Sequence, residues 1–413
     1  RLLIYIDIFF FTLTALLTGY DLFFTLASFL KRKRRKTQYI QFQTFAVIFA
    51  AYKEDAVILE SAKSFIKQDY PKDKYRVIVV SDHMLPETNK ALAELPIELL
   101  TPDFDHSMKH KLRHDALEYI GDSADKVVIM DADNMTDTDF LTRINTITQD
   151  SIVLQVHRTL RTTNTSIAIW DGLSEEINNT IFRKGRVNVG ISSSLIGSGM
   201  VFDLGWLKTH MRKCETFAED KELEIFLAAQ NIFVDYADNI YVYDEKTSRQ
   251  EVMARQRSRW FHAQLVAFGL ILKHFNKHSL NRNYMDKLFQ WIPFPRILKI
   301  LIPVIFMLIW SIQDIHLAYK WLALITGGAL TYWLAIPRKM HTGSSTGTYR
   351  SFPSFFHIDK RIYSLIHPDK NKDTSFQNTP HDITTKKKKA MIKKVSIITI
   401  NYNGLKDTVE MIE

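Results

Sequence analysis

The sequence predicts an α/β domain with a mostly parallel sheet, flanked by helices that are apolar enough to span a membrane. Three observations support this fold class. Short apolar runs alternate with helical patterns over residues 45–156, a long apolar segment occupies residues 2–30, and two further apolar segments lie at 300–312 and 321–337. Strands that alternate with helices are typical of parallel sheets, and a spanning helix needs about 20 mostly apolar residues.

Residues 2–30 predict the first spanning helix, because only Asp7 and Asp21 interrupt the apolar run. The basic run KRKRRK (31–36) follows this segment, whereas a signal peptide carries its positive charge before the apolar stretch. By the positive-inside tendency, the chain after residue 30 is cytoplasmic. Asp21 could be functional within a span, but the favoured interpretation places it near the lipid head groups, where the helix tilts or ends.

The segments 300–312 and 321–337 are each short for a span and together predict a hairpin with a polar tip at residues 313–316. Basic residues flank both open ends and therefore place them in the cytoplasm. These residues are Arg296, Lys299, Arg338 and Lys339. The apolar stretch 261–272 is too short to cross and favours a helix that lies in the membrane interface.

The charge and cysteine content limit the classes of function. The 413 residues carry 54 basic and 45 acidic side chains, a formal charge of +9, which admits anionic lipids or phosphorylated substrates as partners. No basic stripe interleaved with aromatics and no zinc-finger spacing is present, so nucleic-acid binding is disfavoured. The lone Cys214 excludes an intramolecular disulfide and favours a small core residue over a nucleophile.

Within the α/β segment, four apolar runs predict buried strands and two patterns predict helices between them. The strands are 45–50, 76–80, 126–130 and 152–156, and the helices are 56–66 and 109–120. Ligands of such sheets bind at the carboxyl ends of the strands. The polar residues that follow each run are therefore the candidate site.

Acidic residues follow three of these strands. Tyr52, Glu54 and Asp55 follow the first, Asp82 follows the second, and the tripeptide Asp131-Ala132-Asp133 follows the third. Burying several carboxylates together is costly unless cations or hydrogen-bond donors compensate. A D-x-D sequence after a buried strand suits Mg²⁺ or Mn²⁺, which binds one or two carboxylates together with substrate phosphates.

Two further clusters lie downstream, and each has a structural and a functional interpretation. Asp220 precedes a helical pattern, and on this segment alone the favoured interpretation is a helix cap; the alternative is a general base that deprotonates an acceptor hydroxyl. The sequence QRSRW (256–260) either touches anionic head groups as part of a basic helix or places Gln256, Arg259 and Trp260 near a substrate.

Taken in order, these features resemble the family 2 inverting glycosyltransferases, particularly membrane synthases related to cellulose, hyaluronan and poly-N-acetylglucosamine synthases. The resemblance covers roughly residues 1–337. It rests on AAYKED (50–55), Asp82, DAD (131–133), GSGM (197–200), AED (218–220) and the Q-x-x-R-W pattern at 256–260. It implies a GT-A nucleotide-binding fold, a nucleotide-sugar donor that most commonly carries UDP, and a Mg²⁺ or Mn²⁺ cofactor.

The resemblance also implies a role for each matched residue. Around the donor, Tyr52, Glu54 and Asp82 would surround the base and ribose, Asp131 and Asp133 would hold the metal and diphosphate, and Lys109, with Lys111 as competitor, would approach the diphosphate. Asp220 would be the general base. The junction of donor and acceptor would be lined by Gly199, Met200, Glu219, Gln256, Arg259 and Trp260.

The chain departs from the family pattern in three places, one of which is the lack of an R-x-x-x-R arrangement in a β-barrel-like tail. The usual Pro-Ala-Tyr-Asn-Glu opening reads Ala-Ala-Tyr-Lys-Glu at 50–54, and no F-x-V-T-x-K-G segment follows Q-x-x-R-W. Cellulose synthase itself, which also carries an R-x-x-x-R arrangement in its tail, is therefore disfavoured. Three predicted spans are few for a polymer channel, so polymer export would need an oligomer or a partner protein.

We therefore expect a membrane-bound inverting glycosyltransferase that extends a cell-surface or exported polysaccharide. The alternatives are a non-processive transferase that adds one sugar to a lipid-linked acceptor, and a catalytically inactive membrane scaffold. A scaffold has no physical reason to keep the metal-site carboxylates. The expected location is the cell membrane (inner or plasma), as a multi-pass protein with a cytoplasmic catalytic domain.

The predicted organisation has five parts. They are the first helix and its basic flank (1–36), the GT-A domain (37–262), the interfacial helix and hairpin (263–337), a partly disordered cytoplasmic linker (338–393) and the start of a possible second GT-A domain (394–413). In the last part, Val395–Ile400 predicts a strand before a polar turn. We expect the chain to be a fragment of a two-transferase protein, or two adjacent genes joined near Met391.

Overall fold

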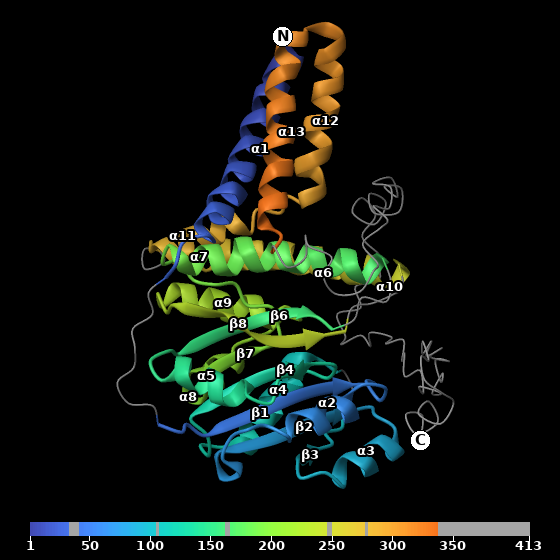
Figure 1. The fold of residues 1–413 in the computed structure, drawn as a ribbon, viewed down its shortest axis with the longest axis vertical. Helices are drawn as coiled ribbons and strands as arrows, with labels where there is room; N and C mark the ends of the chain where they lie inside the picture. Colours follow the sequence, from blue (N-terminus) through green and yellow to red (C-terminus); the bar gives the residue numbers. More distant parts are fainter. Residues whose placement is uncertain (33–40, 105–106, 162–165, 246–249, 277–279, 338–413) are drawn as a thin grey trace, which may run out of the picture. The chain divides into compact units, whose positions relative to one another are not determined.

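The computed structural model describes residues 1–32, 41–104, 107–161, 166–245, 250–276 and 280–337 (Figure 1). The predicted linker (338–393) and the predicted start of a second domain (394–413) lie outside these residues. So does most of the basic run 31–36, of which only Lys31 and Arg32 are described.

An eight-stranded mixed sheet forms the centre of the α/β domain, in the order β3-β2-β1-β4-β7-β6-β8-β5. The strands are β1 (Phe45–Tyr52), β2 (Tyr75–Asp82), β3 (Glu98–Leu100), β4 (Lys126–Asp131), β5 (Met135–Thr136), β6 (Val153–Leu160), β7 (Met200–Asp203) and β8 (Val234–Asp244). All four predicted strands are confirmed. Four of the seven strand pairs in the described sheet are parallel. The sheet is mixed because β7 pairs antiparallel with β4 and β6, and β5 pairs antiparallel with β8.

Helices cover both faces of the sheet, and further helices pack beyond these. They are α2 (Ile58–Phe65), α3 (Pro86–Ala93), α4 (Lys109–Ile120), α5 (Phe140–Thr148), α6 (Ser166–Asn179), α7 (Gly185–Asn188), α8 (Leu204–Met211), α9 (Glu219–Ala229), α10 (Gln250–Lys273) and α11 (Arg282–Gln290). Successive residues of β1 enter two different cores: Val47 and Phe49 pack with α2 and α5, and Ile48 packs with α4 and α8. Burial on both faces explains why β1 reads as a continuous apolar run.

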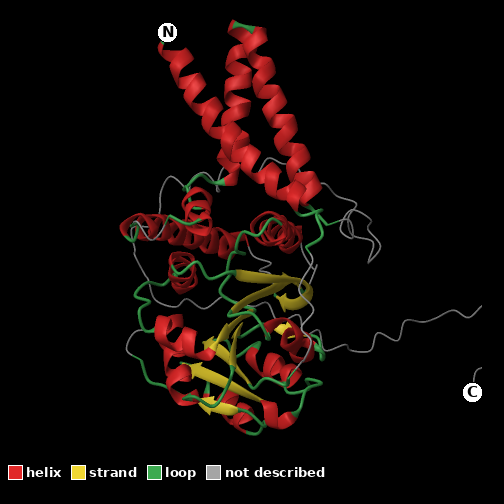
Figure 2. Ribbon diagram, turned by 90° about the vertical axis from the view of Figure 1, so that its left-hand side faces the viewer, coloured by secondary structure: helices red, strands yellow, loops and turns green. Residues whose placement is uncertain are grey.

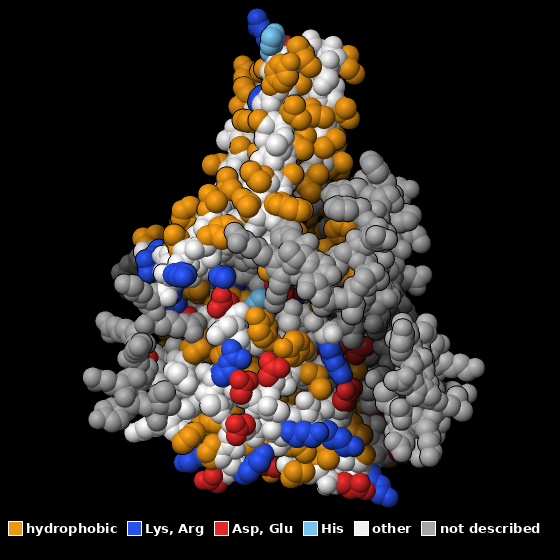
Figure 3. Space-filling view, in the orientation of Figure 1, with side chains coloured by type: hydrophobic (Ala, Val, Ile, Leu, Met, Phe, Trp, Pro, Cys, Tyr) orange, Lys and Arg blue, Asp and Glu red, His pale blue; other side chains and the backbone are white. Residues whose placement is uncertain are grey.

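Three long helices form a bundle beside the α/β domain (Figure 2). They are α1 (Leu2–Ala27), α12 (Arg296–Gln313) and α13 (Ile315–Ala335). Within the described residues, α1 and α12 are long and apolar enough to cross a membrane, and α13, the predicted third span, is not among them. Hydrophobic side chains cover the visible face of the bundle, whereas charged side chains are scattered over the α/β domain (Figure 3).

The predicted hairpin is confirmed as α12 and α13, and its tip is the single residue Asp314, whose Oδ1 accepts a hydrogen bond of 3.0 Å from the His316 amide. Both acidic residues of α1 are buried inside the bundle. Asp7 accepts from the indoles of Trp310 (2.6 Å) and Trp321 (2.8 Å).

Asp21 accepts from Lys299 Nζ (2.7 Å) and from the Tyr332 hydroxyl (2.9 Å). Its side chain is therefore enclosed by the bundle, and its position near the lipid head groups stays a prediction.

A layer of helices lies between the sheet and the bundle, formed by α6, α7, α10 and α11 (Figure 1). The predicted interfacial helix 261–272 is only the second half of α10, which begins at Gln250. The QRSRW sequence consequently lies inside this helix and not before it. The layer is bonded to the bundle, for example where Arg296 donates to Asn178 Oδ1 (2.6 Å) and Thr180 Oγ1 donates to the Ala335 carbonyl (2.6 Å).

Candidate active site

The ends of β1 and β2 lie side by side, because Tyr52 pairs with Asp82 in the parallel register. Lys53 and His83, the residues that directly follow the two strands, have positive φ values of 53° and 54°. Such values are uncommon for residues other than glycine and cluster at functional sites. Asp82 is fully buried. Its Oδ1 lies 2.5 Å from His83 Nδ1, whereas Oδ2 has no hydrogen bond within the described part of the chain.

An aromatic ring borders this buried carboxylate, since the rings of Tyr52 and His83 lie edge to face at 5.7 Å. The loops that follow the two strands are tied together: the Glu54 amide lies 3.1 Å from the Met84 sulfur, and Asp55 Oδ1 accepts from the Leu85 amide at 2.8 Å. A buried acceptor beside a flat ring fits the recognition of a nucleoside.

The third acidic strand end carries Asp131, whose Cα pairs with Ala50 of β1. Its Oδ1 accepts from Lys109 Nζ at 2.7 Å and lies 3.6 Å from Arg113 Nη2. Burial raises the pKa of Asp131, but these two cations outweigh burial and hold the pKa below its usual value. The buried Asn134 closes the turn, accepting from the Asp131 amide (3.0 Å) and donating to Asp133 Oδ1 (3.1 Å).

Sequence reasoning preferred Lys109 and missed Arg113, which joins three of the predicted motifs. Arg113 is fully buried and donates to Glu219 Oε1 (2.5 Å) and to the Gly197 carbonyl (2.6 Å), besides its approach to Asp131. Lys109 and Arg113 are four residues apart on α4 and so share one face of the helix. That spacing was the signal available in the sequence.

The predicted acceptor loop is a glycine turn whose shape depends on a buried glutamine. Gly197 and Gly199 have φ values of 80° and 60°, and a Cβ on Gly199 would lie 2.8 Å from Val156 Cγ2. Gln155 Nε2 donates to the Ser198 and Gly199 carbonyls at 2.9 and 3.1 Å. Met200 begins β7 with a fully buried side chain in the core, so only its backbone belongs to the loop.

Glu219 and Asp220 form the first turn of α9, and Asp220 is not at its N-cap position. The N-cap position is occupied by Ala218, which makes no side-chain cap bond. Asp220 Oδ1 nevertheless accepts a hydrogen bond of 3.0 Å from the Lys221 amide, so this carboxylate bonds a backbone N–H of the first turn, although not from the cap position. The preceding loop is instead fixed by Glu222, whose Oε1 accepts from the Thr216 amide at 2.7 Å. The Asp220 side chain is 21% exposed, and its Oδ2 lies 3.5 Å from Lys221 Nζ.

Helix α10 carries the Q-x-x-R-W residues, with Gln256 and Arg259 half-buried and Trp260 42% exposed. Burial lowers the pKa of the Arg259 guanidinium, and the Asp131 and Glu219 carboxylates oppose that shift. Arg259 therefore lies within electrostatic reach of two of the acidic motifs. Since these come from β4 and α9, the structure brings three separate parts of the sequence to one place.

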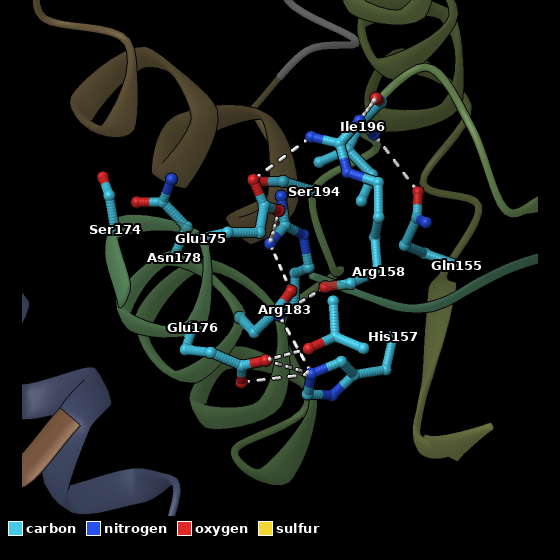
Figure 4. A network of polar contacts seen from close by, with 12 residues as sticks. Gln155, His157, Arg158, Ser174, Glu175, Glu176, Asn178, Arg183, Ser194 and Ile196 are labelled. Atoms are coloured by element: carbon cyan, nitrogen blue, oxygen red, sulfur yellow. Dashed lines mark hydrogen bonds and ion pairs between the residues drawn. The ribbon is translucent and has the colours of Figure 1, made fainter. Parts of the chain in front are cut away.

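A second polar network, also missed from the sequence, holds Ile196, the residue before the glycine turn (Figure 4). Arg158 of β6 donates to the Ile196 carbonyl (3.4 Å) and to Glu175 Oε2 (3.1 Å), and Arg183 donates to the other oxygen of Glu175 (3.1 Å). An isolated arginine in a strand gives no sequence signal of this kind. The network fixes the residue before the glycine turn to α6.

The acidic residues fit a divalent ion that binds together with a phosphorylated ligand. In the described residues, no three His, Cys, Asp or Glu side chains form a group that could hold a metal ion. Asp131 and Asp133 offer two carboxylates, and Mg²⁺ sites of this kind use one or two, with substrate phosphates and water as the remaining ligands. The chemistry of the donor set therefore suits Mg²⁺ or Mn²⁺.

Comparison with known proteins gives one family and a shared fold. The family model described as glycosyltransferase-like family 2 matches residues 43–263, more than half of the chain. No curated protein sequence matches.

Two solved structures are similar to the chain to different degrees. The mannosyltransferase PcManGT from Pyrobaculum calidifontis, in complex with GDP-Man and Mn²⁺, is 15% identical with a TM-score of 0.54, over 78% of this chain and 95% of that one. S. aureus TarS 1-349 in complex with UDP-GlcNAc is 15% identical with a TM-score of 0.43, over 72% and 82%. The likeness to the first of them is one of fold.

Proposed function

The chain belongs to the glycosyltransferase-like family 2, and on this premise we propose that it transfers a sugar, with inversion, from a UDP-sugar to a growing cell-surface or exported polysaccharide. One observation carries the proposal. Arg113 bonds Glu219 and the Gly197 carbonyl and lies 3.6 Å from Asp131, so one buried cation joins the metal-site carboxylate proposed for the donor, the glycine turn proposed for the acceptor and the residue before the proposed base. The PcManGT complex contains a nucleotide-sugar, which supports a donor of this class.

The donor would bind across the ends of β1, β2 and β4. The buried Oδ2 of Asp82 would accept a hydrogen bond from the base or ribose, and Tyr52 and Glu54 would border it. Lys109, which pairs with Asp131 in the structure, would turn towards the diphosphate. A divalent ion held by Asp131 and Asp133 would offset the charge that develops on the leaving diphosphate.

Asp220 would remove the proton from the acceptor hydroxyl while the hydroxyl oxygen forms its bond to the anomeric carbon. The bond from that carbon to the diphosphate breaks in the same displacement, which inverts the configuration. Trp260 offers an exposed ring on which a sugar can stack, and Arg259 and Gln256 lie on the same helix. The glycine turn at 197–199 lets the acceptor approach the backbone closely.

We also propose that α1, α12 and α13 anchor the protein in the cell membrane, with the catalytic domain (37–262) on the cytoplasmic side. Two helices of sufficient length and hydropathy support this placement, as do Lys31 and Arg32 after the first of them. The anchor faces anionic and apolar lipids, and no nucleic acid is expected as a partner.

A second candidate is a transferase that adds one sugar to a lipid-linked acceptor. It is favoured by the interior of the bundle, where Trp310 and Trp321 are buried and bonded to Asp7. A bundle filled in this way offers no passage of its own for a polymer, so polymer export would require further copies or a partner protein.

Nucleotide release from a panel of nucleotide-sugars, with purified membranes and Mn²⁺ or Mg²⁺, tests the proposal. We expect metal-dependent turnover of one donor, reduced by about 10²–10⁴-fold in Asp220→Asn, because general base catalysis contributes a factor of this size. The matched control is Asp122→Asn, whose side chain is 97% exposed. Full activity in Asp220→Asn would refute the role of this carboxylate, and a retained anomeric configuration in the product would refute inversion.

A further inference from the structure

A line of alternating charges runs from the first turn of α9 to α11. Asp220 Oδ2 lies 3.5 Å from Lys221 Nζ, and Lys221 donates to Glu224 Oε1 at 2.8 Å. The other oxygen of Glu224 pairs with Lys287, which donates to Ser194 Oγ at 3.0 Å. Glu224 and Lys287 are 1% and 2% exposed, so the line is anchored in the interior.

The Lys221 ammonium is held in place on several sides. It donates to the Leu195 carbonyl (3.1 Å) as well as to Glu224, and it lies 5.9 Å from the centre of the Trp291 ring. A lysine side chain is ordinarily a flexible, hydrated point charge, whereas this one is only 23% exposed. Its position beside Asp220 is therefore fixed by the fold.

The two neighbouring carboxylates of α9 each have a cation of their own. Arg113 bonds Glu219, and Lys221 is the cation nearest to Asp220 among those whose contacts are described. Two carboxylates next to each other disfavour each other's ionisation. A general base acts in its ionised form, and a cation at ion-pair distance favours that form.

Resting on the function proposed above, we propose that Lys221 is a positioning residue that aims the Asp220 carboxylate at the acceptor and, as the neighbouring cation, favours the charged form of a base. Burial lowers the pKa of Lys221, but Asp220 and Glu224 outweigh burial and raise it above its usual value, so the ammonium stays charged. The charged and titratable groups that face the pair are Glu219, Cys214, Glu224, Arg183 and Lys287.

The test compares Lys221→Met, which keeps the stem and removes the charge, with Lys221→Arg. In the nucleotide-release assay we expect Lys221→Met to lower kcat by about tenfold and to move the acidic limb of the pH–rate profile about one unit higher, because the carboxylate loses a cation at ion-pair distance. Binding of the nucleotide-sugar itself should not change. Lys221→Arg should restore the acidic limb.

The matched control is Lys208→Met, a lysine of α8 with the same 23% exposure that pairs with Asp122 instead. A merely structural Lys221 would weaken donor binding or thermal stability in Lys221→Met without moving the acidic limb, and that result would overturn the proposal. If Lys221→Met does not fold, Lys221→Arg is measured alone. A displaced acidic limb in folded Lys221→Arg would then overturn the proposal.

The two proposals fail differently. If Asp220→Asn is inactive while Lys221→Met keeps the wild-type rate and pH profile, only the role of Lys221 is refuted. If Asp220→Asn is fully active, the base assignment fails first.

Discussion

Gly199 illustrates at the scale of one residue how neighbouring side chains restrict the glycine turn at 197–199. It shares a positive φ with Gly197, but a Cβ on Gly199 would lie 2.8 Å from Val156 and 3.2 Å from Val242, whereas Gly197 has no atom within 4 Å. Contacts below 3.0 Å require the neighbours to move, and both valines are buried in β6 and β8.

We therefore expect Gly199→Ala to destabilise the protein more than Gly197→Ala does. Each variant carries the left-handed strain of about 1–2 kcal/mol, and only Gly199→Ala adds overpacking of about 1–3 kcal/mol. Chemical unfolding of the two purified proteins in detergent checks the order. Equal midpoints would show that β6 and β8 adjust without strain.

Arg113 shows why part of the site could not be predicted. Its partners Gly197 and Glu219 are 84 and 106 residues away along the chain, and nothing near Arg113 in the sequence indicates them. Tyr52, Asp82 and Asp131 were predictable, because each ends an apolar run and the ends of parallel strands meet at one edge. Whether these residues bind a donor remains a prediction.

At the scale of elements, α9 and α11 are joined by the buried Glu224–Lys287 pair. Burial lowers the pKa of Lys287 to about 7, against the opposing effect of Glu224. Its usual value, 10.5, applies in the unfolded chain. Between these two values the unfolded state binds more protons than the folded state, so this group makes stability rise with pH.

Lys287→Met removes this contribution, and we expect the wild type to gain unfolding free energy relative to the variant from about pH 7 to about pH 9. Thermal unfolding of both proteins in detergent across this range measures the difference. Lys208→Met should show no such trend against the wild type. A constant difference between wild type and Lys287→Met would mean that the ammonium is not desolvated in the folded state.

The elements that the sequence predicted correctly are those buried on both faces or with a strong apolar pattern. β1, β2, β4 and β6 are of this kind. β7 was missed because it has four residues, and β8 because polar residues interrupt it as VDYADNIYVYD. The start of α10 was missed because its first turns, up to Arg259, are too polar to show a helical apolar period.

At the scale of the molecule, the bundle is fixed to the α/β domain at the turn that follows α1. Asn188 Nδ2 donates to the carbonyls of Ala27 (3.1 Å), Ser28 (3.2 Å) and Leu30 (2.7 Å). Nearby, a Cβ at Gly185 would collide with the Phe24 carbonyl. The short side chain of Asn188 and the lack of a side chain at Gly185 thus set how closely the bundle approaches the α/β domain.

We expect Asn188→Ala to loosen this turn and to speed trypsin cleavage at the basic residues from Lys31 on, because three hydrogen bonds of one amide are lost. Limited proteolysis followed by mass spectrometry measures the rate. Asn89→Ala, in α3 at the far edge of the sheet, is the control and should cleave as the wild type does. An unchanged rate in Asn188→Ala would show that other contacts hold the turn alone.

The bonding of Asp7 has a consequence for the order in which the protein is made. Its partner Trp310 lies 303 residues later in the chain, and Lys320 and Trp321 come later still. At about 5–20 residues per second, the ribosome needs roughly 15–60 s to supply them. Asp7 of α1 therefore lacks these partners while the strands of the sheet are synthesised, and the three-helix bundle can be completed only after α12 and α13 have emerged.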